Sequence, residues 1–418
     1  MENRVENLLL LTHRIPFPPN KGDKIRSYHL LKHLAQHYRV HLGTFVDDAE
    51  DWQYLPKVQA LCASSHFARL SPPLARLRSL RALLLNRTLS LDYYNDGGLH
   101  AWVKETVKAQ GIGRILVFSS AMAQYAEAYP DAQRVIDFVD VDSDKWRQYA
   151  EKKSWPMSWL YRHEARQLLR YERKVAAACG ASLFVSQPEA ALFRQLAPES
   201  AARIGHFNNG VDTEYFSPAR DYENPYPAGQ RAIVFTGAMD YWPNVDAVQW
   251  FAREVLPGVL ALHPDTVFTI VGARPAPEVQ QLQALPGVRV TGTVPDVRPY
   301  VAHAALAVAP LRVARGVQNK VLEAMAMGKT VIVSPQALEG IRAEAGRDLL
   351  LANDAAQFAA GIVQALAQPD AELGRRARDR VETLYGWASN LAQVETLLEG
   401  NSLSAMQAAE NNTVQDAA

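Results

Sequence analysis

The residues whose types and spacing are best suited to chemistry lie in one segment, Arg315-Gly-Val-Gln-Asn-Lys320-Val-Leu-Glu323-Ala-Met-Ala-Met-Gly328. Gly316 would let backbone N–H groups approach a ligand closely, and residues 318–327 are expected to form a helix whose N-terminus favours an anion. Lys320 and Glu323 share one face of this helix, where an ammonium can meet a diphosphate and a carboxylate can accept two vicinal ribose hydroxyls. The segment predicts a nucleotide site, although the pair alone is equally compatible with a surface ion pair on a capped helix.

A second group of acidic residues follows a strand predicted at residues 135–138. Asp140 and Asp142 stand in a carboxylate-rich turn that could cap a helix. Two carboxylates also serve as the acid and base of a hydrolase, but that assignment depends on their separation. Asp137 and Asp144 extend the group. A divalent ion is not expected there, because a helix N-terminus and cations can neutralise a phosphate instead.

Three histidines stand at helical spacing near the N-terminus. His29, His33 and His37 are four residues apart in one predicted helix. Because no further ligand has a matching spacing, we expect them on the polar, solvated side of that helix. No resident metal or cofactor is predicted.

Short apolar strands alternate with helical segments along the whole chain, which is the pattern of parallel sheets covered by helices on both faces. A first series of strands is predicted at residues 8–12, 40–46, 115–119, 135–138 and 183–186. A second series is predicted at residues 233–237, 267–271, 288–291, 306–309 and 330–334. The sequence therefore predicts an α/β protein with two Rossmann-like, doubly wound parallel-sheet domains facing a cleft.

The predicted domain organisation follows the two series of strands. Its parts are an N-terminal domain (1–210), a connection (211–229), a C-terminal domain (230–385), a C-terminal helix (386–400) and a disordered tail (401–418). The connection is rich in Pro, Tyr and Gly without periodicity, and the tail is small and polar. The helix after the first strand is expected to be entered through Asn20-Lys21-Gly22-Asp23, with Asp23 as its N-cap.

Composition excludes several classes of protein. Lys plus Arg and Asp plus Glu both number 44, with 48% hydrophobic and 21% charged residues, so nothing indicates disorder or a nucleic-acid partner. Cys62 and Cys179 make no disulfide framework, so a reducing cytoplasm is expected. The apolar runs are far shorter than the roughly 20 residues of a membrane span. No Gly-x-Gly-x-x-Gly turn follows a strand, which argues against a dehydrogenase.

One segment, residues 52–91, contains no acidic side chain and six basic ones. Five leucines run among its arginines in partly helical spacing: Leu74, Leu77, Leu80, Leu83 and Leu84. Such a pattern is typical of a basic amphipathic helix on an anionic membrane, although the same leucines could pack onto the sheet. Trp155, Trp159 and Tyr161 suit either a membrane interface or a core helix. We favour peripheral contact with the inner face of the cytoplasmic membrane.

Together these motifs resemble the family-four retaining glycosyltransferases, which have the two-Rossmann GT-B fold. The segment 315–328 is similar to their nucleotide-binding signature. Three other stretches are similar to their first glycine loop, interdomain signature and second-domain opening: Thr12-His-Arg-Ile-Pro-Phe-Pro-Pro-Asn-Lys-Gly22-Asp-Lys24-Ile-Arg26, Asn209-Gly-Val-Asp-Thr-Glu-Tyr-Phe216 and Phe235-Thr-Gly237. Two more resemble the sugar transferases associated with PEP-CTERM, or exosortase, exopolysaccharide loci: Asp137-Phe-Val-Asp-Val-Asp142-Ser-Asp-Lys-Trp146 and Gly237-Ala-Met-Asp-Tyr-Trp-Pro-Asn244.

The resemblance implies transfer of a sugar, with retention and without a metal, from a nucleoside diphosphate donor to a polysaccharide or lipid-linked acceptor. It places the acceptor side in the N-terminal domain. It implies catalytic roles for Asp140, Asp142 and Lys320, and donor contacts from Gly22, Lys24, Gly237, Arg274, Arg315, Gly316, Val317, Gln318, Lys320 and Glu323. A GT-B sugar-nucleotide epimerase and a non-catalytic nucleotide-sugar-binding protein are the alternatives.

The chain departs from the family pattern at two places. Arg315 stands where relatives commonly carry a glutamate that touches the donor sugar. Ala238 and Pro243 stand at about the positions where many relatives carry an arginine and a lysine for the diphosphate. The charge of the leaving diphosphate must then be balanced by other cations. The candidates are Lys320, Arg274, Lys24 and Arg26.

Overall fold

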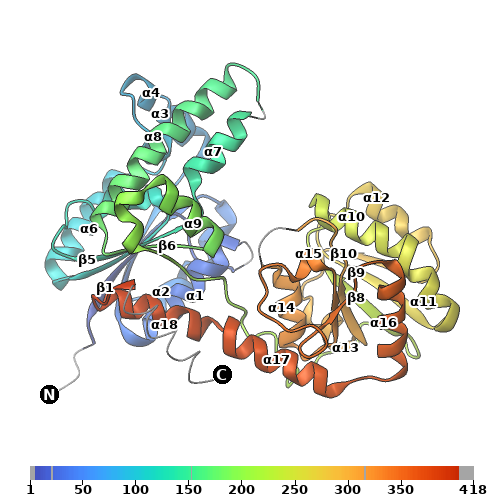
Figure 1. Ribbon diagram of the computed structural model, residues 1–418. Coiled ribbons are helices and arrows are strands. Elements are labelled where there is room, and N and C mark those ends of the chain that lie inside the picture. Colours follow the sequence, from blue (N-terminus) through green and yellow to red (C-terminus); the bar gives the residue numbers. More distant parts are fainter. Residues whose placement is uncertain (1–4, 20–21, 152, 315–316, 404–418) are drawn as a thin grey trace. The chain divides into compact units, whose positions relative to one another are not determined.

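The computed structural model describes residues 5–19, 22–151, 153–314 and 317–403 (Figure 1). The chain divides into two compact units. Unit 1 comprises Met1–Asn209 together with Asn390–Ala418, and unit 2 comprises Gly210–Ser389. Each unit has its own sheet and its own core.

The core of unit 1 is a seven-stranded parallel sheet with the order β3-β2-β1-β4-β5-β6-β7. Its strands are β1 (Asn7–Thr12), β2 (Arg39–Val46), β3 (Ser64–Arg69), β4 (Arg114–Phe118), β5 (Gln133–Val139), β6 (Ala181–Phe184) and β7 (Ile204–His206). The central strand β1 reads as a run of leucines because parallel strands are covered on both faces, and Leu8 to Leu11 are all fully buried. The strand order reverses between β1 and β4.

Helices cover this sheet and extend beyond it. They are α1 (Gly22–His37), α2 (Leu55–Gln59), α3 (Pro72–Ser79), α4 (Arg81–Leu84), α5 (Leu89–Tyr93), α6 (Gly97–Gln110), α7 (Asp142–Glu151), α8 (Met157–Ala178), α9 (Gln187–Leu196) and, from the end of the chain, α18 (Trp387–Leu398). Figure 1 shows that α7 and α8 pair lengthwise and project from the sheet, with α3 and α4 beside α8. We call α3, α4 and the projecting ends of α7 and α8 the arm. None of the helices that the structure describes is both long and apolar enough to cross a membrane.

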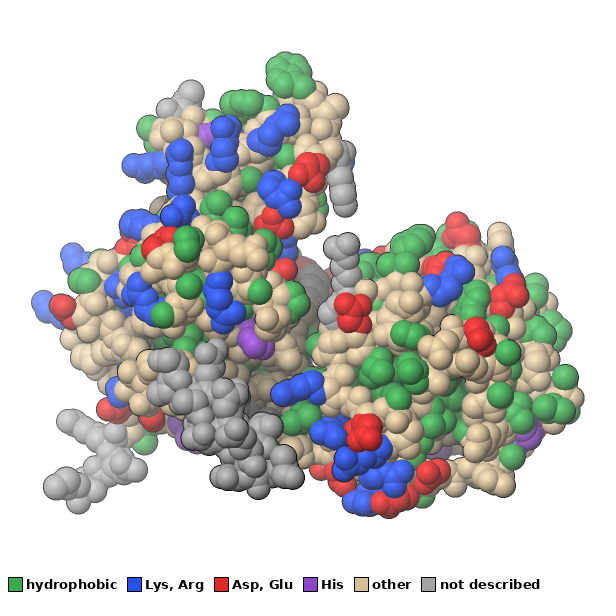
Figure 2. All heavy atoms as spheres, viewed as in Figure 1, with side chains coloured by type: hydrophobic (Ala, Val, Ile, Leu, Met, Phe, Trp, Pro, Cys, Tyr) green, Lys and Arg blue, Asp and Glu red, His purple; other side chains and the backbone are tan. Residues whose placement is uncertain are grey.

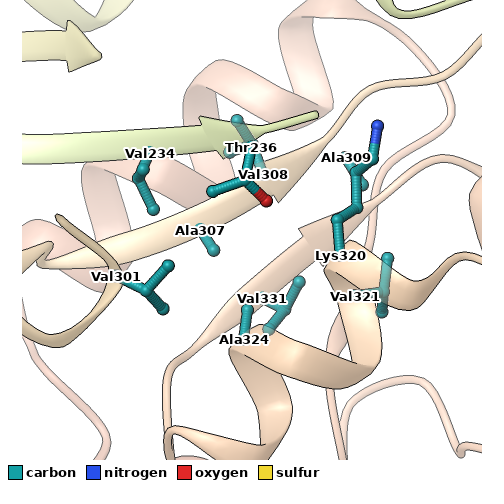
Figure 3. Close-up of a pocket in the computed structure, with 10 residues that line it drawn as sticks. All are labelled: Val234, Thr236, Val301, Ala307, Val308, Ala309, Lys320, Val321, Ala324 and Val331. Atoms are coloured by element: carbon teal, nitrogen blue, oxygen red, sulfur yellow. The ribbon is translucent and has the colours of Figure 1, made fainter. Parts of the chain in front are cut away.

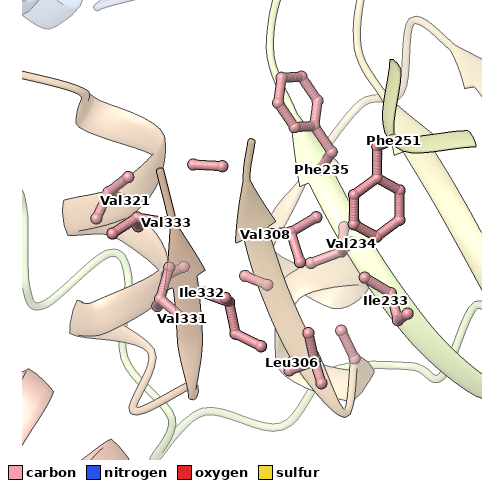
Figure 4. Close-up of a cluster of buried hydrophobic side chains, with 14 of the residues drawn as sticks. Ile233, Val234, Phe235, Phe251, Leu306, Val308, Val321, Val331, Ile332 and Val333 are labelled. Carbon is pink, nitrogen blue, oxygen red and sulfur yellow. The ribbon is translucent and has the colours of Figure 1, made fainter. Parts of the chain in front are cut away.

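Unit 2 is built on a six-stranded parallel sheet with the order β10-β9-β8-β11-β12-β13. The strands are β8 (Arg231–Thr236), β9 (Thr266–Val271), β10 (Val288–Gly292), β11 (Leu306–Ala309), β12 (Val331–Val333) and β13 (Leu350–Leu351). The main helices are α10 (Trp242–Trp250), α11 (Leu256–Leu262), α12 (Pro277–Gln280), α13 (Arg298–His303), α14 (Asn319–Ala326), α15 (Pro335–Leu338), α16 (Ala355–Ala367) and α17 (Ala371–Tyr385). Figure 4 shows aliphatic side chains of β8, β11 and β12 packed with Phe251 and with Val321 of α14. This core holds α14 against the sheet.

The two-sheet α/β prediction is confirmed, and three local predictions are wrong. Asp23 is not an N-cap: it lies inside the first turn of α1, where its carboxylate accepts from Arg14. The histidine face is solvated only at His37, since His29 is buried and His33 is largely covered beside Glu395 of α18. The leucine-rich part of the basic segment forms two short helices, α3 and α4, on either side of Leu80 rather than one helix.

Candidate functional site

The strand order of unit 2 reverses between β8 and β11, which makes the crevice at their carboxyl ends the expected ligand site of such a sheet. Gly237 directly follows β8, and α14 follows β11 through the connection that contains Arg315 and Gly316. Those two predicted donor residues lie outside the described part of the chain. Val317 and Gln318 are half-buried, and Gln318 stands at the N-cap position of α14. The predicted helix is thus present, beginning at Asn319.

Lys320 is the cation at this crevice. Its ammonium donates to Asn244 Oδ1 at 2.5 Å and lies 4.2 Å from the centroid of the Phe235 ring. Figure 3 shows a narrow pocket between β8, β11 and α14, lined by small apolar side chains, with the Lys320 ammonium pointing away from that lining. The side chain therefore presents its charge toward the carboxyl ends of the strands.

Gly237 is required by the close approach of Lys320 and Asn244. A Cβ at position 237 would lie 2.7 Å from Asn244 Nδ2 and 3.2 Å from Lys320 Nζ, at a backbone φ of +156°. Asn244 also donates to the carbonyl of Ala238 at 2.9 Å, which fixes the turn after β8. Gly272 packs behind it, because a Cβ there would lie 1.6 Å from the carbonyl oxygen of Gly237. The glycines allow two loops to meet backbone to backbone at the site.

Burial sets the protonation of the Lys320 and Glu323 pair. It lowers the pKa of the Lys320 ammonium to about 7, an effect that the negative charge of Glu323 partly opposes. It raises the pKa of the Glu323 carboxyl to about 7, and the positive charge of Lys320 opposes that shift. A diphosphate next to Lys320 would favour the charged ammonium. The pair can therefore respond to an anionic ligand by taking up a proton.

Arg274 is a second cation at the same edge of unit 2. It follows β9, adopts a left-handed φ of +53° and has a side chain that is 73% exposed. Its guanidinium pairs with Asp240 at 3.0 Å, and Met239 donates to the carbonyl of Ala273 in the adjacent loop. To bind an anion, Arg274 would have to give up only its ion pair with Asp240, and exposed ion pairs contribute little stability.

The acidic residues after β5 do not form one cluster. Asp140 and Asp142 share Lys145, whose Nζ lies 2.6 Å and 3.3 Å from their carboxylates. Asp144 pairs with Arg147, and Asp137 is fully buried beside Arg26. Burial raises the pKa of Asp142 against the opposing charge of Lys145. Each of these carboxylates thus has a cation at ion-pair distance.

Two cations of the first loop have structural roles in unit 1. Lys24 is 2% exposed, and its ammonium lies 2.5 Å from Asp51. Arg26 is fully buried and makes a two-point contact with Asp137 at 2.7 and 3.2 Å. The structure therefore removes both from the cations available to a diphosphate, contrary to expectation. Gly22 opens α1, and a Cβ there would meet nothing within 4 Å.

Sequence reasoning missed His13 and Arg14, which lie where the strand order of unit 1 reverses. Arg14 donates to Asp47 at 2.8 to 3.0 Å and to Asp23 at 2.6 Å. His13 stacks on Phe118 at the end of β4, and its Nε2 lies 3.5 Å from Asp23. Arg14 and His13 hold the pKa of Asp23 well below its usual range against the effect of burial. Their position directly after the first strand was the available signal.

Two parallel-sheet units, each with its polar residues at a strand-order reversal, define the GT-B class of glycosyltransferase folds. Residues 230–368, which lie in unit 2, match the family model of glycosyl transferases group 1. The fold and the domain together support a GT-B glycosyltransferase. No curated protein matches the sequence significantly.

Solved structures with this fold align along almost the whole chain. Sucrose-phosphate synthase from Thermosynechococcus elongatus has a TM-score of 0.59 at 17% identity, covering 94% of this chain and 98% of its own. Anabaena HepE in complex with UDP has a TM-score of 0.61 at 15% identity, covering 95% and 100%. A glycosyltransferase from Rickettsia africae has a TM-score of 0.60 at 14% identity, covering 96% and 100%.

Proposed function

We propose that this protein is a retaining glycosyltransferase that moves a sugar from a nucleoside diphosphate donor to a polysaccharide or lipid-linked acceptor in exopolysaccharide biosynthesis. The observation that carries the proposal is Lys320, held by Asn244 at the strand-order reversal of unit 2 with Glu323 one turn further along α14. The structural relative HepE has been solved with UDP-glucose, which supports a nucleotide-sugar donor.

The diphosphate and the ribose of the donor fit the two side chains of the Lys320 and Glu323 pair. Lys320 and the N-terminus of α14 would bind the diphosphate, and Glu323 would accept the ribose hydroxyls. Arg274 would add a second positive charge. As the glycosidic bond breaks, these groups stabilise the negative charge on the leaving diphosphate, so no divalent ion is required. Asp140 and Asp142 would orient a hydroxyl, with Lys145 holding both carboxylates in place.

A thermal-shift panel of nucleotide sugars tests the donor site. The right donor at about 100 times its Kd should stabilise the native state by roughly 2.7 kcal/mol. Glu323→Gln should weaken that donor by about 10- to 150-fold, because a hydrogen bond to a charged group contributes on the order of 1.5 to 3 kcal/mol. Glu278→Gln, a surface change on α12 of the same unit, is the matched control. Unchanged donor affinity in Glu323→Gln would contradict the assignment of Glu323 to the donor site.

Product analysis separates transfer from the alternatives. Incubation of the donor with lipid-linked or oligosaccharide acceptors should yield a glycoside of unchanged anomeric configuration, with no need for added Mg²⁺ or Mn²⁺. A free epimerised nucleotide sugar would indicate an epimerase instead. Donor binding without turnover on any acceptor would indicate a binding protein.

The arm of unit 1 supports the proposed membrane contact. Leu74, Leu77 and Leu80 of the α3 region and Trp155 and Trp159 at the α7–α8 end are exposed, Leu77 by 69% and Trp155 by 80%. Figure 2 shows Lys and Arg side chains gathered with hydrophobic ones over this part of unit 1. Exposed aliphatic and indole groups next to arginines match the boundary of an anionic bilayer. We assign the arm to docking on the membrane that carries the acceptor.

Buried polar contacts hold the arm in its shape. Glu164 of α8 is 2% exposed and accepts from Thr88 Oγ1 at 2.5 Å and from the backbone N–H of Leu89 at 2.6 Å. Arg78 donates to the carbonyl of Asp92 at 3.2 Å, and Arg81 donates to the Asp92 carboxylate at 3.1 Å. These contacts hold α3 to α5 against α8 in an arrangement that leaves the leucines on the surface. Arg78 and Arg81 serve this folding role, which leaves Arg76 as the freer cation.

A further inference from the structure

The two ends of unit 1 meet where α18 packs beside α1. Leu391, Val394, Leu397 and Leu398 of α18 are buried. Three hydrogen bonds fix the helix: Asn390 donates to Asn208, Arg114 donates to Leu398, and Gln133 donates to Leu397. The part of α18 from Asn390 onward therefore belongs to the same compact unit as α1.

Three side chains with metal-binding chemistry converge at this junction. His33 and His37 lie one turn apart on α1, and Glu395 reaches toward them from α18. Glu395 Oε1 lies 3.2 Å from His33 Nε2 and 3.4 Å from His37 Nε2. One potential ligand atom from each residue lies within 4.8 Å of the others. Two imidazoles and a carboxylate are thus aimed at one point.

The two nitrogen-to-oxygen distances have the lengths expected of a tetrahedral zinc site. Zinc–nitrogen and zinc–oxygen bonds of about 2.0 to 2.2 Å at tetrahedral angles place neighbouring ligand atoms about 3.3 to 3.5 Å apart. Both measured separations are close to this edge length. A zinc ion could therefore be bound with only small movements of these side chains.

The same atoms lack other partners. His33 Nε2 and Glu395 Oε1 are buried, and neither makes a hydrogen bond to any residue in the described part of the chain. The Glu395 carboxylate has the two imidazoles at ion-pair distance, and a cation bound among the three side chains would satisfy both buried atoms. His37 is 50% exposed, which leaves one side open for a water as the fourth ligand.

We propose that His33, His37 and Glu395 bind one Zn²⁺ ion that clips α18 to α1. The His-x-x-x-His spacing puts both imidazoles on one helix face, and borderline-soft zinc accepts nitrogen and carboxylate ligands together. The site lies about 15 Å along α1 from Asp23, near the end of the helix that leads to the amino end of β2. It is therefore separate from the residues at the carboxyl ends of the strands. Its role is to tie α18 to α1.

Calorimetry with Zn²⁺ alone tests this site on the full-length protein after chelator treatment and dialysis. We expect one Zn²⁺ per chain and a higher Tm in its presence, while Mg²⁺ and Ca²⁺ have no such effect. His37→Gln and Glu395→Gln should each weaken zinc binding at least 100-fold. Since His37 is half exposed, His37→Gln should fold normally, and circular dichroism checks this.

His100→Gln is the matched control, because His100 is an exposed histidine on α6 of the same unit. It should bind zinc as the wild type does. Absence of stoichiometric zinc binding in the wild type, or equal binding by wild type, His37→Gln and Glu395→Gln, would overturn the proposal.

Discussion

The ammonium of Lys320 lies 2.5 Å from Asn244 Oδ1, and this contact joins α14 to the turn that follows β8. Asn244 reaches the position because its amide also donates to the carbonyl of Ala238. The lysine is thus held by a neutral partner, so its charge is not cancelled by an ion pair at that contact. A fixed, uncompensated ammonium is what a diphosphate site requires.

Gly237→Ala should disrupt that arrangement. The added Cβ would lie 2.7 Å from Asn244 Nδ2 and 3.2 Å from Lys320 Nζ, so both side chains must move. We expect a stability loss of about 1 to 3 kcal/mol and at least tenfold weaker donor binding. Thermal unfolding and calorimetric titration measure the two effects.

Gly258→Ala is the control, because a Cβ there would make only an ordinary 3.5 Å contact with Ala359. Equal donor affinity in wild type and Gly237→Ala would contradict the assigned role of Lys320.

Donor affinity should fall as pH rises through neutrality. The pKa of Lys320 is lowered from 10.5 to about 7, so in the free protein the ammonium loses its proton above that pH. Binding of a diphosphate that needs the charged form must then be accompanied by proton uptake. The donor affinity should therefore fall by up to about tenfold per pH unit above pH 7. A nucleotide sugar does not itself titrate in this range. Calorimetry in buffers of different ionisation enthalpy measures the uptake, and Lys320→Met should bind weakly and lose the fall in affinity above pH 7, which leaves only the titration of Glu323. A flat profile in the wild type would show that Lys320 does not meet the diphosphate.

The sequence predicted strands that are buried on both faces better than strands at the edges. The inner strands β1 and β8 were recognised because each contains a run of four apolar side chains, Leu8 to Leu11 and Ala232 to Phe235. The edge strand β3, Ser64–Arg69, was missed because it is mixed in polarity, and β7 and β13 were missed because they are only three and two residues long. Local pattern carries little information about such strands, whose position depends on pairing with a neighbour.

The site shows the same division between local and long-range information. Lys320 and Glu323 could be predicted, because residues three apart on one helix share a face. The pairing of Lys24 with Asp51 could not, since a buried salt bridge depends on packing. The partner of His33 and His37 comes from the other end of the chain, and no spacing in the sequence relates Glu395 to them.

Replacing Arg26 by methionine should destabilise unit 1 strongly. Arg26 and Asp137 are both fully buried, and the guanidinium also donates to Phe207 and Asn209. Removing the arginine leaves a buried carboxylate without its counter-charge, which typically costs about 3 to 5 kcal/mol. Burial already raises the pKa of Asp137, and Arg26 opposes that shift, so the loss should be greatest above the carboxyl's unfolded pKa and smaller in acid. Urea unfolding at two pH values measures this. The double variant Arg26→Met with Asp137→Asn should recover part of the stability, and a pH-independent loss would contradict the mechanism.

The arm should bind anionic membranes through its exposed leucines as well as its charge. In Leu74→Gln with Leu77→Gln, two large exposed apolar side chains are lost, and each contributes up to about 1.5 to 3 kcal/mol when buried. We therefore expect at least tenfold weaker sedimentation with phosphatidylglycerol vesicles. Arg76→Glu should weaken binding further at low salt, and added salt should reduce that difference by screening.

Leu262→Gln removes a leucine of unit 2 that is 66% exposed and is the matched control. Turnover on a soluble acceptor analogue should persist in every variant. If the leucine double variant, the control and the wild type sediment equally with the vesicles, the arm does not bind membranes through its leucines.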